Sequence, residues 1–308
     1  MFDIWYYLNY LTFGCFGTNN IFKMDSTKYV TIKLLNTGGF GQIFLVENEN
    51  TKYAIKQIET NCPSDMIKVQ KEIDIHLSLD HRNVLNLIKS SRDVSDGQNV
   101  GTFLMLMPYQ ENGSLQDDFD NRKKSNDFIK KDRIKTIFGG ILDGVEYLHT
   151  RNPIIIHKDL KAANILLSQD DTPLIMDFGS AAEGIETVLD SIQSRRLLDE
   201  CNECCSMPYR APELFHCEIG TQIGEKVDIY SVGGILFALY HLRGPYDLEY
   251  ETGGSYALAS NSGVLKFGKD VPIPNQNYIK GLMAVNPVER LPIKVAKEHF
   301  TKLTFENV

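Results

Sequence analysis

The chain has 308 residues, 43% of them apolar, which is enough for one large domain or for two lobes that share a cleft. Its formal net charge is −8 and no long run of like charge occurs, so the basic surface typical of nucleic-acid-binding proteins is absent. We therefore expect no nucleic-acid partner. The six cysteines form no paired CxxC sites and no secretory signal precedes them, which favours a reducing compartment.

The first 22 residues are rich in aromatic side chains, with eight aromatic residues and no basic one. Polar residues such as Asp3 and Asn9 interrupt the segment, which makes it too short for a membrane span. Aromatic residues do favour the bilayer interface. Two interpretations stay open: attachment to a membrane surface, and a disordered or loosely packed leader.

From Tyr29 onward, short β-type runs alternate with turn signals. The runs YVTIKLL, QIFLVEN and KYAIKQI predict three strands of one antiparallel sheet. Between the first two lies NTGGFG (residues 36–41), whose glycines would let backbone amide groups approach a phosphate closely. A plain turn is the alternative interpretation of this motif alone.

A helical pattern follows the third strand, which contains the motif YAIK ending at Lys56. Ser64 is the expected N-cap after Pro63, and Glu72 lies in the helix, sixteen residues after Lys56. An ion pair between Lys56 and Glu72 can therefore form, whereas a solvated strand lysine is the alternative. The apolar stripe of the helix consists of Met66, Val69, Ile73 and Leu77.

Two further segments predict buried elements. Residues 102–115 (TFLMLMPYQENGSL) indicate a strand that ends at Pro108, which halts sheet pairing, before Gly113 loosens the chain. Residues 134–149 indicate a buried helix. Its apolar stripe consists of Ile134, Ile137, Phe138, Ile141, Leu142, Val145 and Leu148.

Two polar motifs come after this helix, HKDLKAAN (residues 157–164) and DFG (residues 177–179). They supply a carboxylate placed to accept a hydroxyl proton, an ammonium to hold a phosphate, and two oxygen ligands for Mg²⁺. Phosphoryl transfer from a nucleotide explains this set better than packing does. The residues in that order are Asp159, Lys161, Asn164 and Asp177.

A long segment separates DFG from APE (residues 211–213). Residues 191–200 lack glycine and proline and carry apolar residues at helical spacing, which predicts an added helix. The sequence gives only weak support for a zinc site formed by Cys201, Cys204, Cys205 and His216, because a single CxxC lacks a second pair.

These motifs, in this order, resemble the eukaryotic protein kinase superfamily. The stretches TGGFG, PLIMDFGSA, SRRLLDE and GPYDLEYETGGSYALA further resemble the myristoylated and palmitoylated serine/threonine kinase family of the Numb-associated kinase group. The resemblance implies an α+β, two-lobed protein kinase fold, with a five-stranded antiparallel sheet and one helix in the N-lobe and a mainly helical C-lobe. The expected divisions are a leader (1–28), a kinase domain (29–303) with N-lobe (29–107), hinge (108–110) and C-lobe (111–303), and a tail (304–308).

The resemblance also implies roles for single residues. Asp159 and Lys161 would be catalytic, Asn164 and Asp177 would bind Mg²⁺, and ATP would donate the phosphate to serine or threonine hydroxyls of protein substrates. Lys161 and Ser206 favour serine/threonine over tyrosine specificity. The residues expected to bind the nucleotide are Leu35, Asn36, Thr37, Gly38, Gly39, Phe40, Gly41, Gln42, Ile43, Lys56, Glu72, the gatekeeper Met107, and Pro108, Tyr109 and Gln110 of the hinge.

The chain departs from the family pattern at two positions. Asn36 stands where the first glycine of the loop is expected, and Lys158 replaces the arginine before the catalytic aspartate. Arginine grips a phosphate with two hydrogen bonds whereas lysine offers a point charge, so control by an activation-segment phosphate should be weaker. Both departures motivate one alternative function, a catalytically weak kinase-like scaffold that recruits partners. Asp228 and Arg290 match structural residues of the family.

In that family, acylated cysteines in a short leader attach the kinase to Golgi, vesicle or, in fungi, vacuolar membranes. Cys15 lies in the corresponding leader and is a palmitoylation candidate, whereas Phe2 replaces the glycine that myristoylation requires. We therefore expect a cytoplasmic kinase attached peripherally to an endomembrane.

Overall fold

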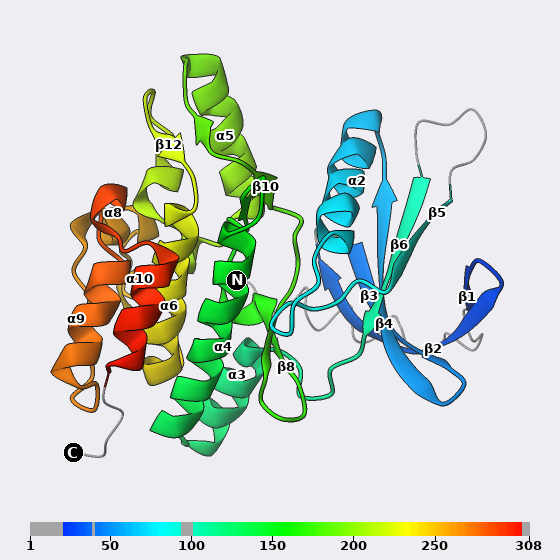
Figure 1. The fold of residues 1–308 in the computed structure, drawn as a ribbon, viewed down its shortest axis with the longest axis horizontal. Helices are drawn as coiled ribbons and strands as arrows, with labels where there is room; N and C mark the ends of the chain where they lie inside the picture. Colours follow the sequence, from blue (N-terminus) through cyan, green and yellow to red (C-terminus); the bar gives the residue numbers. More distant parts are fainter. Residues whose placement is uncertain (1–20, 39–40, 94–100, 304–308) are drawn as a thin grey trace. The chain divides into compact units, whose positions relative to one another are not determined.

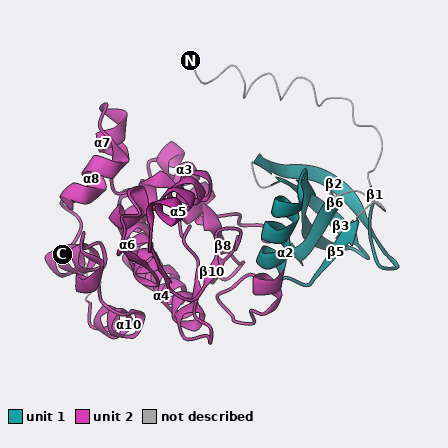
Figure 2. Cartoon of the chain, turned by 90° about the horizontal axis from the view of Figure 1, so that it is seen from above, with its two compact units in different colours: residues 1–73, 87–109 teal, residues 74–86, 110–308 magenta. Residues whose placement is uncertain are grey.

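The computed structural model describes residues 21–38, 41–93 and 101–303, and its fold is α+β, as predicted (Figure 1). The chain forms two compact units (Figure 2). Unit 1 contains residues 1–73 and 87–109, and unit 2 contains residues 74–86 and 110–308.

Unit 1 is built on an antiparallel sheet of six strands, in the order β1-β2-β3-β4-β6-β5. The prediction of five strands was wrong because residues 21–24, assigned to the leader, form an additional edge strand. Met24 of this strand is 1% exposed and packs with Tyr29, Val46, Ile55 and Leu106, which explains why the short strand is held. The strands are β1 (Ile21–Met24), β2 (Thr27–Gly38), β3 (Gly41–Asn48), β4 (Thr51–Thr60), β5 (Lys89–Asp93) and β6 (Gly101–Pro108).

Helix α2 (Pro63–Leu77) begins two residues earlier than the predicted N-cap Ser64 implies. The backbone N–H of Met66 donates to the Cys62 carbonyl, so Cys62 is the residue that caps the helix and Ser64 lies inside it. Proline suits the first helical position because its missing N–H has no partner there in any helix.

The end of α2 and the following segment (residues 74–86) belong to unit 2, although they fall inside the predicted N-lobe. Backbone hydrogen bonds explain this assignment. The N–H of Leu85 donates to the Ile175 carbonyl at 2.8 Å, and the N–H of Ile175 donates to the Asn83 carbonyl at 2.9 Å. The Asn83 side chain adds a bond to the Pro173 carbonyl at 3.0 Å.

Unit 2 is mainly helical, and its core surrounds α4 (Lys131–His149) and α6 (Lys226–His241). All seven residues of the predicted stripe on α4 are buried, so that prediction is confirmed. Helix α6 is apolar on nearly all sides and is buried accordingly. The other helices are α3 (Leu115–Ser125), α5 (Ser191–Cys204), α7 (Asp247–Glu251), α8 (Tyr256–Ser262), α9 (Ile273–Leu282) and α10 (Ile293–Thr301). Short pairs of strands complete the unit: β7 (Ile155–Ile156) with β10 (Ala182–Glu183), β8 (Ile165–Leu167) with β9 (Pro173–Ile175), and β11 (Glu186–Thr187) with β12 (Gln222–Ile223).

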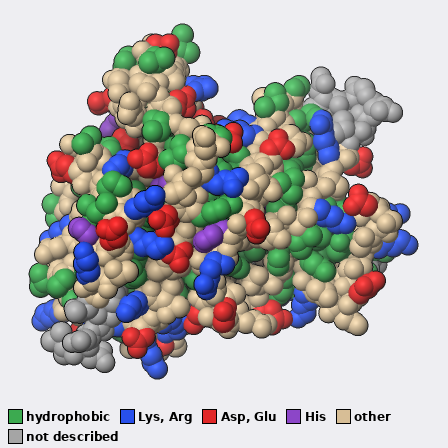
Figure 3. Space-filling view, in the orientation of Figure 1, with side chains coloured by type: hydrophobic (Ala, Val, Ile, Leu, Met, Phe, Trp, Pro, Cys, Tyr) green, Lys and Arg blue, Asp and Glu red, His purple; other side chains and the backbone are tan. Residues whose placement is uncertain are grey.

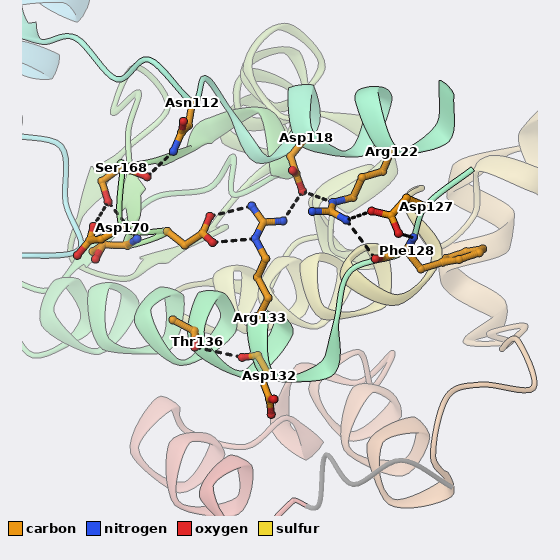
Figure 4. Close-up of polar contacts among 12 residues, drawn as sticks. Asn112, Asp118, Arg122, Asp127, Phe128, Asp132, Arg133, Thr136, Ser168 and Asp170 are labelled. Atoms are coloured by element: carbon orange, nitrogen blue, oxygen red, sulfur yellow. Dashed lines mark hydrogen bonds and ion pairs between the residues drawn. The ribbon is translucent and has the colours of Figure 1, made fainter. Parts of the chain in front are cut away.

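A polar network joins three elements of unit 2 (Figure 4). The guanidinium of Arg133 on α4 donates to Asp118 of α3 at 2.7 Å and, through two nitrogens at 2.8 and 3.0 Å, to Asp171 in the β8–β9 turn. Such a bidentate pair fixes both angle and distance. The network therefore fixes the β8–β9 hairpin, which follows the HKDLKAAN motif, against the helices.

Candidate active site

The glycine-rich motif of unit 1 forms the end of the β2–β3 hairpin. Gly38 pairs with Gly41, and the predicted residues Gly39 and Phe40 lie outside the described residues. Gly41 has a φ of +111°, and an added Cβ would lie 2.1 Å from the Gln57 carbonyl oxygen, so only glycine fits there. The other residues expected at the nucleotide lie on these two strands: Leu35, Asn36, Thr37, Gln42 and Ile43.

Asn36 occupies an ordinary strand position. It pairs with Ile43 just after a register shift in β2, and its φ is not positive. The backbone therefore does not require glycine at this position, and the departure from the family pattern leaves the hairpin intact.

Lys56 and Glu72 form an ion pair in unit 1. The Lys56 Nζ lies 2.7 Å from Glu72 Oε1, and the side chains are only 9% and 6% exposed. Lys56 projects from β4, where it pairs with Met105 of β6, and Glu72 projects from α2. A buried ammonium and a buried carboxylate each need a partner, so this pair fixes the lysine head group against α2.

The predicted hinge lies where the two units meet along the chain. Met107 is buried and pairs with Ala54, and Pro108 ends β6. Tyr109 ends the second segment of unit 1, and Gln110 begins the second segment of unit 2. Their role in binding adenine stays a prediction.

Asp228 of α6 holds the backbone of the HKDLKAAN loop in unit 2. Its carboxylate is fully buried and accepts the backbone N–H groups of His157 and Lys158, both at 2.8 Å. It also lies 2.9 Å from the Nε2 of His149, at the end of α4. Burial works to raise the pKa of Asp228, but the hydrogen bond and charge of His149, together with His157, lower it. The backbone of the loop is therefore hydrogen-bonded to a carboxylate that stays ionised.

Three groups fix the carboxylate of Asp159. Lys161 Nζ donates to Oδ2 at 2.8 Å, the backbone N–H of Ser206 donates to Oδ1 at 2.7 Å, and Asn164 Nδ2 approaches Oδ2 at 3.2 Å. Lys161 also donates to the Ser206 hydroxyl at 2.6 Å. Asp159, Lys161 and Asn164, which the sequence predicts as one set, therefore meet Ser206 at one point.

The residues expected to bind Mg²⁺ fit a hard cation. The Asn164 amide nitrogen donates to the backbone carbonyl of Asp159 at 2.9 Å, so its oxygen is the atom that remains as a metal ligand. The backbone N–H of Met176 donates to the Asn164 carbonyl at 3.0 Å, which brings Asp177, the residue after Met176, near Asn164 in space. An amide oxygen and a carboxylate are the ligands that Mg²⁺ prefers.

The DFG phenylalanine secures this arrangement within unit 2. Phe178 is 1% exposed, and its ring centroid lies 5.2 Å from that of His157 and 4.9 Å from that of His76. His157 Nε2 lies 3.0 Å from the Met176 carbonyl oxygen. The loop and the DFG segment are therefore packed together as one piece.

The predicted extra helix of the segment between DFG and APE is confirmed as α5 (Figure 1), and it packs against the short helical turn of residues 212–215. Asp190 caps it by accepting the Gln193 N–H at 2.8 Å. From its last turns, Glu200 reaches Lys158 of the catalytic loop, with 3.1 Å between Oε1 and Nζ. Burial lowers the pKa of Lys158, but Glu200 outweighs it and the pKa is raised.

The segment ends in a buried ion pair. Arg290 donates two hydrogen bonds to the Glu213 carboxylate, at 2.6 and 2.8 Å, and is itself 1% exposed. Its guanidinium also lies 4.9 Å from the centroid of the Tyr230 ring. This pair anchors APE to the region that follows α9.

The cysteines considered for zinc have other surroundings. Cys201 and Cys205 are buried with Cys217, and hydrogen bonds from Cys205 and Cys217 lower the pKa of the Cys201 thiol. His216 is bonded to Asn261 at 2.9 Å. In the described ranges, no group of three or more histidine, cysteine, aspartate or glutamate side chains is arranged to hold a metal ion.

Two contributors to the site were missed from the sequence, Glu200 and His149. Glu200 on α5 contacts Lys158 across 42 positions of the chain, and His149 at the end of α4 contacts Asp228 across 79 positions. The stretch SRRLLDE contains Glu200 and was quoted only as a family resemblance, while the helical spacing around it was the one available signal.

Charged side chains of both signs are interspersed over the face shown in Figure 3. In the part of the chain that the structure covers, no helix combines the length and hydrophobicity that a membrane crossing needs. The acylation candidate Cys15 lies outside the described residues.

Comparison with known proteins agrees with this geometry. Residues 29–300 match the protein kinase domain family. Serine/threonine-protein kinase 16 of Rattus norvegicus is 30% identical over 291 residues, covering 91% of this chain and 92% of the relative, and that of Homo sapiens is 32% identical over 247 residues, covering 80% of each. Serine/threonine-protein kinase ppk13 of Schizosaccharomyces pombe is 27% identical over 288 residues, covering 82% of this chain and 83% of the relative. The chain is therefore a serine/threonine-protein kinase of the eukaryotic protein kinase superfamily, and it belongs to the myristoylated and palmitoylated kinase family that serine/threonine-protein kinase 16 represents.

Proposed function

We propose that Asp159 is the residue that orients the substrate hydroxyl and accepts its proton during phosphoryl transfer. The observation that carries this assignment is the fixed carboxylate of Asp159, held by Lys161, Asn164 and the backbone of Ser206. As the hydroxyl oxygen bonds to the γ-phosphorus of ATP, the bond from that phosphorus to the bridging oxygen breaks, and ADP leaves. The proton passes to the Asp159 carboxylate.

Lys161 and Lys56 supply the positive charge that this chain itself contributes. Lys161 would stabilise the transferring phosphoryl group while keeping Asp159 in place, and Lys56, oriented by Glu72, would hold the α- and β-phosphates. Asn164 and Asp177 would bind Mg²⁺, which neutralises phosphate charge when bound. Met107, Pro108, Tyr109 and Gln110 are assigned to the adenine.

Asp159→Asn tests this proposal. The amide keeps the size of the side chain but cannot accept the proton, so we expect kcat to fall by roughly 10²- to 10⁴-fold. Phosphate incorporation into a protein substrate would be measured with Mg²⁺ and ATP, and phosphoamino-acid analysis of the product should yield phosphoserine or phosphothreonine.

The exposed carboxylate of Asp199 provides the matched control, because Asp199→Asn makes the same chemical change at an exposed position on α5. Thermal melting of both variants checks that they fold. Equal incorporation by the parent protein and Asp159→Asn would refute the assignment and favour a kinase-like scaffold.

We further propose that the leader attaches the kinase to an endomembrane, with an acyl chain on Cys15 as one signal and the aromatic residues as a second. A single acyl chain gives only marginal binding, so two signals are needed. Cys15→Ser should shift the protein from the membrane fraction to the soluble fraction of cells, whereas Cys62→Ser should not. An unchanged membrane fraction for Cys15→Ser would remove the acyl chain from the proposal.

A further inference from the structure

Lys158 is a buried cation whose position is tied to the catalytic aspartate that follows it. The residue is 7% exposed, and its backbone N–H is bonded to Asp228. Its ammonium needs a partner to remain charged in this environment. The partner is Glu200, at 3.1 Å, and Cys201 and Cys205 also act electrostatically to raise the pKa of Lys158.

The C-terminal end of α5, which carries Glu200, is fastened to other parts of the activation segment as well. The hydroxyl of Ser180, directly after DFG, donates to the Cys204 carbonyl at 2.9 Å. Arg210, directly before APE, donates to the Cys205 carbonyl at 3.1 Å and to the Asn202 side chain at 2.9 Å. Cations at a helix C-terminus are also favoured by the helix dipole.

The chain directly after α5 also contacts the catalytic aspartate. Ser206 follows the helix cap Cys205, and its backbone N–H donates to Asp159 at 2.7 Å. Glu200 therefore accepts a hydrogen bond from Lys158, the residue before Asp159. Ser206, six residues after Glu200, donates to Asp159 itself. The segment from Glu200 on α5 to Ser206 just after the helix thus contacts the catalytic loop at two adjacent residues.

The hydroxyls on α5 lie too far from Lys158 for their phosphates to replace the contact that Glu200 makes with it. Ser191 and Ser194 occupy the first turn of the helix. With a rise of about 1.5 Å per residue, Ser194 is roughly 9 Å from Glu200 along the axis, and Ser191 is farther. Ser180 and Ser206 are already engaged by the Cys204 carbonyl and Lys161.

We propose that Glu200 is a positioning residue that holds Lys158, and through it the catalytic loop, in the place where an activation-segment phosphate would otherwise be required. This inference rests on the proposed role of Asp159. It follows that the kinase is active without phosphorylation of this segment. Glu200 therefore acts on kcat through the geometry of the loop.

The experiment combines a double-mutant cycle with removal of phosphate. Full-length parent, Glu200→Gln, Lys158→Met and the double variant would be treated with a protein phosphatase, and mass spectrometry would verify the loss of phosphate. Asp199→Asn, on the same helix, is the matched control. We expect the parent and the control to keep their kcat, and Glu200→Gln to lose about three- to tenfold in kcat with an unchanged KM for ATP, a modest loss because Glu200 is partly exposed. The double variant should lose no more than Lys158→Met alone, since both act through one contact.

Hydrogen exchange separates this inference from the proposed catalysis, because it needs no activity. Peptides covering residues 157–161 should exchange faster in Glu200→Gln than in Asp199→Asn, while thermal melting shows that both are folded. Unchanged exchange together with an unchanged kcat would overturn the role of Glu200, as would multiplicative effects of the two substitutions. Loss of parent activity after phosphatase treatment would overturn the independence from phosphate. A parent that matches Asp159→Asn in activity, with loop exchange still sensitive to Glu200, would refute the catalytic assignment alone.

Discussion

Two residues of the active site have a left-handed backbone conformation, which residues other than glycine rarely adopt. Lys158 has a φ of 63° and Asp177 a φ of 66°. The left-handed conformation costs about 1–2 kcal/mol for such residues. At Lys158 the surroundings offset this cost, because Asp228 accepts the N–H and Glu200 accepts from the ammonium. These contacts thus keep Lys158 in its strained conformation, which sets the direction of the chain at Asp159, the next residue.

The same conformational argument predicts a contrast between two glycines of the β2–β3 hairpin. In Gly41→Ala, the new Cβ would meet the Gln57 carbonyl at a φ that alanine disfavours. We expect the free energy of unfolding to fall by more than about 2 kcal/mol, measured by urea denaturation.

Gly38 pairs with Gly41 and provides the control. A Cβ added at Gly38 has no heavy atom within 4 Å, and its φ is not in the positive range. Gly38→Ala should therefore change the free energy of unfolding by less than about 0.5 kcal/mol. Similar losses in the two variants would show that the close approach at Gly41 does not limit stability.

At the scale of elements, the sequence predicted those whose stability is local or periodic. The stripe on α4 has the full helical period, and α5 lacks residues that break helices, so both were found. The boundaries were less well predicted, as α5 continues to Cys204 although the pattern supported it only to Glu200. Motif order alone was sufficient for Asp159, Lys161 and Asn164, which the structure brings together.

Elements that depend on distant partners were missed. Strand β1 has only four residues and follows an aromatic stretch, and its pairing with β2 and the burial of Met24 create it. Residues 74–86 include the last turn of α2, which begins in unit 1, but backbone bonds of Asn83 and Leu85 to β9 place this segment in unit 2. The partnership of Glu200 with Lys158 spans 42 positions, so no local spacing could reveal it.

At the scale of the whole chain, Asp228 is the buried charge on which several elements of unit 2 depend. It lies in the first turn of α6, where a negative charge also favours the helix dipole. Its three partners come from α4 and from the catalytic loop. Removing the charge should therefore be felt in global stability and in its dependence on pH.

Asp228→Asn should lower the free energy of unfolding by about 3 kcal/mol at neutral pH, because two backbone donors and His149 lose a charged acceptor. The pKa of Asp228 is lowered in the folded chain. A carboxyl group with a lowered folded pKa stabilises the fold above its unfolded pKa of about 3.9, and this contribution is lost as pH falls through the folded value. The difference between the parent and Asp228→Asn should therefore be constant from neutral pH to about pH 5 and shrink below pH 4. Urea denaturation across this range measures it, with the exposed Asp93→Asn as control. A difference that stayed constant down to pH 3 would mean that the stabilisation comes from packing and not from the charge of Asp228.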